Sequence, residues 1–296
     1  MLRRGGLVGL PTETVYGLAA DAANEIAVRR IFAAKGRPAD HPLIVHLADV
    51  AELQRWAAAV PASASTLAEA CWPGPLTVLV PRAAHVLDVI TGGRDTVGLR
   101  VPAHPLALDV LRRFGDGVAA PSANRFGKVS PTAASHVIAD LGDAVDFVLD
   151  GGPSPIGVES TIVDCTVSPP QILRPGGIPD EDIARILDIA MPSGPSRASG
   201  MLASHYAPAA RVELASSLAE AEARSVLLSA QGSQVDVIDP ARDLVRAAHD
   251  LYAWLRSADE RNLDVLIAVM PPAVGLGHAI RDRLTKAAGL GAAGRG

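Results

Sequence analysis

The sequence predicts an α/β fold, and three observations support this prediction. Short apolar runs alternate with longer stretches of helical periodicity along the whole chain, which is the pattern of strands that alternate with helices. The chain has 296 residues, of which 49% are hydrophobic, so it can bury one large core or two ordinary ones. Its 27 Gly and 23 Pro punctuate the apolar segments and form no low-complexity tract, which argues against disorder.

Residues 1–190 are expected to form a first domain in which strands and helices follow one another. Asn24 is a good N-cap for a helix that ends at Gly36, and Asp49 followed by Glu52 has the capping pattern of a second helix. Further helices are expected at 104–113, 131–140 and 180–190. The apolar runs predict strands at Leu7–Leu10, Leu43–Leu47, Leu76–Val80, Val97–Val101, Phe147–Leu149, Thr161–Val163 and Gln171–Leu173.

A linker is predicted at 191–210. The segment Met191–Gly200 contains two Pro and two Gly, which neither continue a helix nor pair in a central strand. Beyond the linker, residues 211–296 are expected to form a second, smaller α/β domain of ordinary size. Its predicted elements are a strand at 225–230, a short strand at 235–238, a helix at 240–257, a strand at 263–269 and a helix at 277–288.

Charge and composition narrow the classes of function. A net charge of −5 and 3% aromatic residues disfavour binding of nucleic acid through a basic surface or through stacked bases. Cys71 and Cys165 have no Cys or His at metal-ligand spacing, so neither a zinc site nor a disulfide framework is predicted. Pro11 interrupts the first apolar run too soon for a signal peptide, and no later run is long enough to span a membrane. We therefore expect a soluble protein of the reducing cytoplasm.

Two polar motifs follow apolar segments. Pro11–Gly17 places two hydroxyls and a carboxylate after a strand, where open α/β sheets bind ligands, although a polar turn explains the motif equally well. Lys35 and Arg37 follow a helix end, where cations ordinarily interact with the helix dipole. Only three of the 27 basic residues are Lys, however, and a Lys beside an Arg suits a polyphosphate. His46 ends an apolar strand, and such a residue is more often part of the core than a ligand.

Further polar residues lie at strand ends and in loops. Ser122, Asn124 and Ser130 can form an anion cradle beside a predicted helix, although turn chemistry and helix capping explain each of them as well. Arg100 and Arg174 each end an apolar strand, so both can project a cation toward one site. A surface ion pair is the commoner role for such a residue.

Several familiar signatures are missing from the sequence. It contains no P-loop pattern GxxxxGK[ST], which excludes a Walker-type NTPase. Gly275 and Gly277 imitate the start of a dinucleotide fingerprint, but Ile280 takes the third glycine position and two prolines interrupt the preceding turn, so NAD is not expected. No GxSxG nucleophile elbow is present, so a hydrolase of that type is not supported.

Eight stretches in this order resemble the YrdC-type threonylcarbamoyl-AMP synthase family in its longer, two-domain form. The resemblance implies a catalytic domain with a twisted, open mixed sheet and a smaller Rossmann-like α/β domain at the C-terminus. The family usually has a helix before the first strand, so we expect either a start upstream of Met1 or the loss of that helix. The matching stretches are PTETVYGL (11–18), AAKGRP (33–38), PLIVH (42–46), WPGPLTVLV (72–80), GLRVP (98–102), APSAN (120–124), GVESTIVD (157–164) and ILRPGG (172–177).

The resemblance implies an enzyme that makes L-threonylcarbamoyl-AMP and pyrophosphate from L-threonine, bicarbonate and ATP. A separate transferase complex would then pass the threonylcarbamoyl group to the adenosine beside the anticodon of certain tRNAs. Lys35 and Arg37 match the catalytic pair. The implied ATP-binding residues are Lys35, Arg37, Thr96, Ser122, Asn124, Ser130, Arg174 and Tyr206. The implied threonine-binding residues are Thr12, His46, Arg100 and Ser160.

The resemblance also carries expectations about the metal and the linker. Mg²⁺ would accompany ATP and be held mainly by nucleotide and water, because the motifs include no carboxylate cluster. The linker, which bears His205 and Tyr206, is interpreted as a lid that closes over the pocket and protects a hydrolysable mixed anhydride.

Two other readings remain open. A non-catalytic module that binds double-stranded RNA or a nucleotide would use the same basic pocket, but the acidic net charge predicts weak RNA binding at most. Carbamoyl transfer, as in the larger hydrogenase-maturation proteins with a similar domain, is disfavoured because this chain lacks their zinc-finger cysteines.

Overall fold

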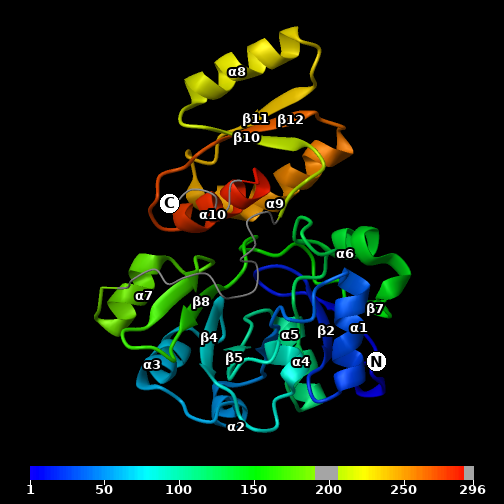
Figure 1. Ribbon diagram of the computed structural model, residues 1–296, viewed down its shortest axis with the longest axis vertical. Helices are drawn as coiled ribbons and strands as arrows, with labels where there is room; N and C mark the ends of the chain where they lie inside the picture. The colour runs from blue at the N-terminus through cyan, green and yellow to red at the C-terminus, as the bar shows by residue number, and fades with distance from the viewer. Residues whose placement is uncertain (191–205, 290–296) are drawn as a thin grey trace.

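Nine strands join in one mixed sheet in the computed structural model, which describes residues 1–190 and 206–289 (Figure 1). Across the sheet the strands follow the order β7-β1-β2-β6-β3-β5-β4-β8-β9. The pairs β1/β7, β3/β5 and β4/β8 are parallel, and the other neighbours are antiparallel. The strands are β1 (Val8–Leu10), β2 (Gly17–Asp21), β3 (Ile44–His46), β4 (Leu76–Pro81), β5 (Thr96–Arg100), β6 (Val118–Ala119), β7 (Phe147–Val148), β8 (Thr161–Asp164) and β9 (Gln171–Arg174).

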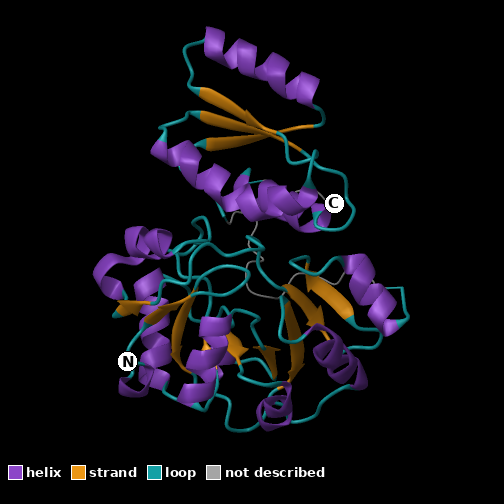
Figure 2. Cartoon of the chain, turned by 180° about the vertical axis from the view of Figure 1, so that it is seen from behind, coloured by secondary structure: helices purple, strands orange, loops and turns teal. Residues whose placement is uncertain are grey.

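Helices flank this sheet and share a large apolar core with it (Figure 2). The loops at one end of the strands lie between the sheet and the C-terminal part of the chain. The α-helices are α1 (Glu25–Lys35), α2 (Leu53–Trp56), α3 (Ala62–Cys71), α4 (Asp88–Thr91), α5 (Pro105–Phe114), α6 (Ala134–Leu141) and α7 (Asp180–Leu187). Short 3-10 turns are η1 (Leu2–Arg4), η2 (Val50–Glu52) and η3 (Gly142–Ala144).

Helix α1 shows how local chemistry sets an element that leads into the site. The Asn24 side chain accepts a hydrogen bond from the backbone N–H of Ala27 and so caps the first turn. Gly36 ends the helix with φ +62°, a left-handed conformation that glycine adopts without a Cβ clash. The cap turns the chain directly after Lys35 and gives Arg37 its direction.

The second unit is a three-stranded parallel sheet with the strand order β10-β12-β11. Helix α8 covers the face away from the first domain, whereas α9 and α10 lie between the small sheet and the first domain (Figure 1). Every residue of β12 is buried, as expected for a central parallel strand. The elements are β10 (Arg211–Ala215), α8 (Leu218–Ala230), β11 (Val235–Ile238), α9 (Leu244–Glu260), β12 (Val265–Val269) and α10 (Gly277–Ala287).

The two domains share an apolar cluster at their interface. Val15 and Val158 of the first domain belong to the same cluster as Leu251 and Ile280 of α9 and α10. Close approach of α9 depends on Gly157, because a Cβ at this position would lie 2.5 Å from two backbone oxygens of that helix. The interface is therefore packed like a domain interior over the loops that connect the strands.

The structure confirms the α/β class, the mixed sheet and the smaller α/β domain. The strand predicted at 225–230 is wrong, because these residues belong to α8. Ser217 caps that helix by accepting from the N–H of Glu220, and Val226 and Leu227 are 69% and 58% exposed whereas Leu228 is buried, as on the two sides of a surface helix. The predicted linker at 191–210 lies mostly outside the described residues, so its boundaries and its role as a lid stay predictions.

Some elements escaped the sequence patterns. Strand β2 is Ala- and Gly-rich, β6 has two residues, and α3 contains Ser and Ala in place of a clear apolar stripe. Strand β10 lies in the predicted second domain, at residues for which no strand was predicted. None of the helices in 1–190 and 206–289 has the length and apolar character needed to cross a membrane.

Candidate active site

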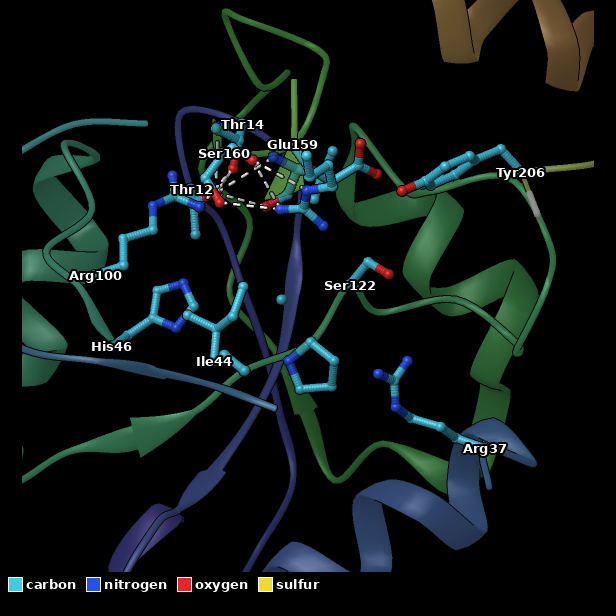
Figure 3. A pocket seen from close by; sticks show the side chains of 15 residues that line it. Thr12, Thr14, Arg37, Ile44, His46, Arg100, Ser122, Glu159, Ser160 and Tyr206 are labelled. Carbon is cyan, nitrogen blue, oxygen red and sulfur yellow. Dashed lines mark hydrogen bonds between the residues drawn. The ribbon is translucent and has the colours of Figure 1, made fainter. Parts of the chain in front are cut away.

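A pocket lies where β1, β3, β5 and β9 end and β8 begins, on the side of the sheet that faces the second domain (Figure 3). His46 and Arg100 lie on one side of it, Arg37 and Tyr206 on the other, and Ser122 lies between them. The pocket is lined by Thr12, Thr14, Val15, Gly17, Arg37, Ile44, His46, Arg100, Ala120, Pro121, Ser122, Glu159, Ser160, Arg174 and Tyr206.

Arg100 anchors the loop that follows β1. Its Nη2 donates to Glu13 Oε1 at 2.5 Å and its Nη1 to Thr14 Oγ1 at 2.9 Å, while Nε donates to the carbonyl oxygen of Gly74 at 3.3 Å. Both members of the ion pair are buried. A guanidinium carries more N–H groups than these three bonds use, so Arg100 can also donate into the pocket. In the same loop the Thr12 hydroxyl donates to the carbonyl oxygen of Val15 at 2.6 Å.

His46 is a buried, neutral imidazole. Burial and the adjacent Arg100 cation lower its pKa to about 3. Its Nδ1 has no hydrogen-bond partner among the residues that the structure describes. Buried polar atoms are ordinarily satisfied, so this nitrogen is a position at which a ligand can make a hydrogen bond.

Ser160 and Arg174 form a second polar pair. Arg174 donates from Nε and Nη2 to the backbone oxygen of Ser160 at 3.1 and 2.9 Å, and from Nη2 to Ser160 Oγ at 3.0 Å. The same hydroxyl lies 2.8 Å from Thr77 Oγ1 of β4. Burial lowers the pKa of Arg174 from its usual value. The pair brings a guanidinium and a hydroxyl to the pocket from neighbouring strands.

Lys35 stabilises a loop at the pocket without lining the pocket itself. Its Nζ donates to the backbone oxygens of Ser122 and Asn124 at 2.5 and 2.6 Å, and the side chain is buried. Burial and the nearby Arg37 lower its pKa well below the usual value. Asn124 donates from Nδ2 to two backbone oxygens, whereas its Oδ1 has no partner among the described residues. Lys35 thus fixes the loop that carries Ser122 instead of lining the pocket itself.

Arg37 and Tyr206 close the far side of the pocket. Arg37 donates from Nη2 to the backbone oxygen of Pro42 at 3.0 Å, and its guanidinium lies 5.7 Å from the ring centroid of Phe126. Burial lowers the pKa of Arg37 to about 10, so it remains a cation. Burial also raises the pKa of Tyr206, so its hydroxyl stays protonated. Tyr206 has φ +62° and contacts the second domain.

Glu159 is the one carboxylate among the residues that line the pocket. Burial would raise its pKa, but Arg283 and Arg174, with hydrogen bonds from Ser130 and Tyr252, lower that pKa to about 2. The Ser130 hydroxyl donates to Glu159 Oε1 at 2.6 Å. The Glu159 carboxylate is therefore ionised and bonded to Ser130, Tyr252 and Arg283. It is unsuited to serve as a general base near neutral pH.

Eight of the predicted site residues line this pocket together, and the remaining four lie elsewhere. Lys35, Asn124 and Ser130 are not among the residues that line it. Thr96, predicted for the same nucleotide site, lies at the opposite end of β5 from Arg100 and lines an adjoining cavity of about 500 Å³. Ile44 lines both the pocket and this cavity, so the two adjoin. The eight that share the pocket are Thr12, Arg37, His46, Arg100, Ser122, Ser160, Arg174 and Tyr206.

Sequence reasoning missed the partners that fix the predicted residues. Glu13 and Thr14 lie in a motif that was recognised, but nothing in the sequence identified them as the partners of Arg100. Glu159 lies in the recognised stretch 157–164, yet its partner Arg283 is 124 positions away on a helix without a motif. Only the folded chain brings these groups together.

The arrangement suits a ligand with several negative charges. Arg37, Arg100 and Arg174 are all buried and converge from three different strands or helix ends. Partly desolvated guanidinium groups interact strongly with phosphates and carboxylates and present fork-shaped donors to them. The neutral His46 and the hydroxyls around it add acceptors and donors for an uncharged polar group on the ligand.

Comparison with known proteins extends over nearly the whole chain. Residues 1–176 match the family model Sua5_yciO_yrdC, described as telomere recombination, and residues 178–289 match the model of the threonylcarbamoyl-AMP synthase C-terminal domain. A threonylcarbamoyl-AMP synthase of Pyrococcus abyssi is 42% identical over 97% of this chain and 92% of the relative. One from Bacillus subtilis is 41% identical over 98% of this chain and 91% of the relative.

A solved structure agrees with these sequence matches. The crystal structure of Pyrococcus abyssi Sua5 complexed with L-threonine superposes with a TM-score of 0.93 at 41% identity, over 98% of this chain and 92% of that one. Two consecutive domain models and full-length relatives above 40% identity give one consistent assignment. This chain belongs to the YrdC-type threonylcarbamoyl-AMP synthase family, in its two-domain form.

Proposed function

We propose that this chain is an L-threonylcarbamoyladenylate synthase, which converts L-threonine, bicarbonate and ATP to threonylcarbamoyl-AMP and pyrophosphate. The observation that carries the proposal is the convergence of Arg37, Arg100 and Arg174 on one pocket, in a chain related over its full length to enzymes of that name. The relative whose structure contains L-threonine supports this amino acid as one substrate. No observation favours RNA binding or carbamoyl transfer of the hydrogenase-maturation type.

The threonine end of the reaction is assigned to the side of the pocket with His46 and Arg100. A free Arg100 N–H suits the threonine carboxylate, and Thr12 and Ser160, whose hydroxyls can share in its binding, line the same pocket. The unpartnered Nδ1 of the neutral His46 can accept a hydrogen bond from a polar hydrogen of the amino acid. The threonine amine, in its neutral form, attacks bicarbonate carbon, and loss of water leaves the carbamate.

The nucleotide end is assigned to Arg37, Arg174, Ser122 and Tyr206, with the adjoining cavity at Thr96 as room for the rest of ATP. A carbamate oxygen attacks the α-phosphorus and the bond to pyrophosphate breaks. Such a transfer needs alignment and neutralisation of charge on phosphate oxygens more than covalent help from the protein. Arg37 and Arg174 supply positive charge, while Lys35 holds the loop of Ser122 in place and the Asn124 side chain bonds within that loop.

Mg²⁺ is proposed to accompany ATP, to which it supplies charge neutralisation when bound. Glu159, which lines the pocket, is engaged by Arg283, and Glu13, next to the lining residues Thr12 and Thr14, is engaged by Arg100. Within the described parts of the chain, no three potential ligand side chains of the His, Cys, Asp or Glu type gather in one place. Phosphate oxygens and water are therefore the ligands expected for the ion.

The proposal also includes what happens to the product after release. Threonylcarbamoyl-AMP is a mixed anhydride that water hydrolyses, so a separate transferase must accept the threonylcarbamoyl group soon after release. The proposed acceptor system is the tRNA threonylcarbamoyl transferase complex. The pocket's location between two packed domains supports a product formed away from bulk water.

Pyrophosphate release tests the proposed reaction. With ATP and Mg²⁺, release should require both L-threonine and bicarbonate. Arg37→Ala should lower kcat/KM by about 100-fold, because it removes a cation from the transferring phosphate. The matched control is Arg112→Ala, at an exposed arginine on α5, which should retain wild-type release. Release without L-threonine at the full rate, or full activity of Arg37→Ala, would refute the assignment.

A further inference from the structure

A buried ion pair joins the two domains directly behind the pocket. The Arg283 side chain of α10 is 0% exposed and donates from Nε to Glu159 Oε2 at 3.0 Å. From Nη1 it donates to the backbone oxygen of Pro175 at 2.6 Å. Glu159 precedes Ser160 and Pro175 follows Arg174, so one guanidinium holds both segments that carry the Ser160–Arg174 pair.

Tyr252 of α9 contacts the same carboxylate. Its hydroxyl lies 2.9 and 2.8 Å from the two carboxylate oxygens of Glu159. Its ring lies 5.6 Å from that of Tyr206, and the Arg283 guanidinium lies 5.4 Å from the Tyr206 ring centroid. Two residues of the second domain therefore contact two residues that line the pocket.

The apolar cluster already provides a reason for the domains to dock, so the buried charges need a separate explanation. Burying an ion pair costs desolvation free energy that the mutual attraction does not reliably repay. For the Glu159–Arg283 pair, this desolvation cost arises at the part of the interface that touches the pocket. Another interdomain ion pair, between Arg256 and Asp140, is 14% and 17% exposed and contacts no residue of the pocket lining.

Glu159 also links Arg283 to Arg174. Glu159 is attracted by both Arg283 and Arg174. With Arg283 in place, the Glu159 carboxylate is satisfied by Arg283, Tyr252 and Ser130, and Arg174 donates to Ser160 instead. Without Arg283, Arg174 is the other cation that attracts the buried carboxylate, and moving there would break the Ser160–Arg174 pair.

We propose that Arg283 and Tyr252 are positioning residues of the second domain, which fix Glu159 and through it the Ser160–Arg174 pair of the pocket. Neither residue lines the pocket, so neither is a catalytic residue. The proposal rests on the proposed function, because the geometry that these residues hold is that of the adenylating site. It makes the second domain an integral part of that site.

The test measures pyrophosphate release and L-threonine binding by the full-length chain. Arg283→Gln and Tyr252→Phe should each lower kcat/KM by about 10- to 100-fold, as misplaced reacting groups do. Both should also weaken L-threonine binding, measured by calorimetry, by about tenfold. Arg283→Lys should recover part of the loss, because an ammonium can pair with Glu159 but cannot also reach Pro175 in the same fork.

Two controls separate positioning from stability and docking. Arg281→Gln changes an arginine of the same helix that bonds within the second domain, and Asp140→Asn breaks the interdomain ion pair with Arg256. Both should stay within about twofold of wild type. If Arg283→Gln does not fold, Tyr252→Phe, which keeps the ring packing, decides the matter.

The outcomes are distinct. Wild-type kinetics and L-threonine affinity in both Arg283→Gln and Tyr252→Phe would overturn the proposal and leave the proposed function standing. An equal loss in Asp140→Asn would also overturn it, since docking alone would then explain the effect. If wild type releases no pyrophosphate, the proposed function fails, and L-threonine affinity alone decides the role of Arg283.

Discussion

Individual residues of the site owe their charge states to burial and to one or two neighbours. His46 is neutral because burial and the Arg100 cation disfavour its protonated form. Glu159 is ionised in spite of burial because Arg283, Arg174 and two hydroxyls stabilise the anion. The pocket therefore presents cations, a neutral imidazole and a fully engaged carboxylate, a set that attracts anionic substrates without protonating them.

Proton linkage at His46 gives a testable pH dependence. The unfolded histidine binds a proton below about pH 6.5, whereas the folded one does so only near pH 3. The unfolded state thus binds more protons between these values, so stability falls as the pH is lowered, by up to about 1.4 kcal/mol per pH unit from this group. His46→Asn should flatten the fall between pH 7 and pH 4, measured as the free energy of unfolding in urea.

A matched variant controls this experiment. His85→Asn replaces an exposed histidine in the same domain and should retain the wild-type slope. An unchanged slope in His46→Asn would mean that the buried imidazole is not the group that resists protonation.

Site residues were predictable where they lie in contiguous motifs at strand ends, as Thr12, Arg100 and Ser160 do. The direction of a side chain was not predictable in the same way. Lys35 was expected to face a phosphate, and its ammonium donates instead to the backbone oxygens of Ser122 and Asn124, which only tertiary contacts bring near it. Arg283 gave no local signal at all, because its partner comes from the other domain.

At the scale of elements, helix ends place the functional side chains. Helix α1 ends at Gly36, and the turn there brings Arg37 to the pocket while Lys35 stays beneath the neighbouring loop. The cap at Gly36 has φ +62°, which an L-residue with a Cβ adopts only with strain.

Gly36→Ala should therefore have two effects. The free energy of unfolding should fall by about 1 kcal/mol because the left-handed cap becomes strained. KM for ATP should also rise several-fold, since the direction of Arg37 depends on this turn. Chemical denaturation and steady-state kinetics would measure the two effects separately.

Gly115→Ala is the matched control, because Gly115 caps α5 with φ +80° away from the pocket. It should cost similar stability and leave KM for ATP unchanged. If both variants changed KM alike, the Gly36 turn would have no particular role in orienting Arg37.

Elements with strong local signals were predicted correctly, and those without them were not. The helix that begins after Asn24 has a cap, periodicity and a glycine stop, so its bounds followed from the sequence. The run Val226–Leu228 looked like a strand because it is apolar, but it lies in α8, the helix that Ser217 caps. Here the prediction followed the apolar run and did not use the local cap.

At the scale of the whole molecule, the second domain completes the first. The apolar cluster of Val15 and Val158 with α9 and α10 fixes the two units together, and Gly157 permits the close approach. The order of domains was predictable from composition and from the family resemblance. The contacts between them were not, because surface helices of a small α/β domain carry no sequence mark of what they cover.

The central claim is that the pocket joins threonine, bicarbonate carbon and AMP in one product. The most direct measurement is mass spectrometry of the reaction with ¹³C-labelled bicarbonate, ATP, Mg²⁺ and L-threonine. The predicted result is threonylcarbamoyl-AMP that carries the label in its carbamoyl group, formed together with pyrophosphate. Unlabelled threonyl-AMP, or AMP with no threonine adduct, would contradict the claim, because the adenylated group would then not be the carbamate.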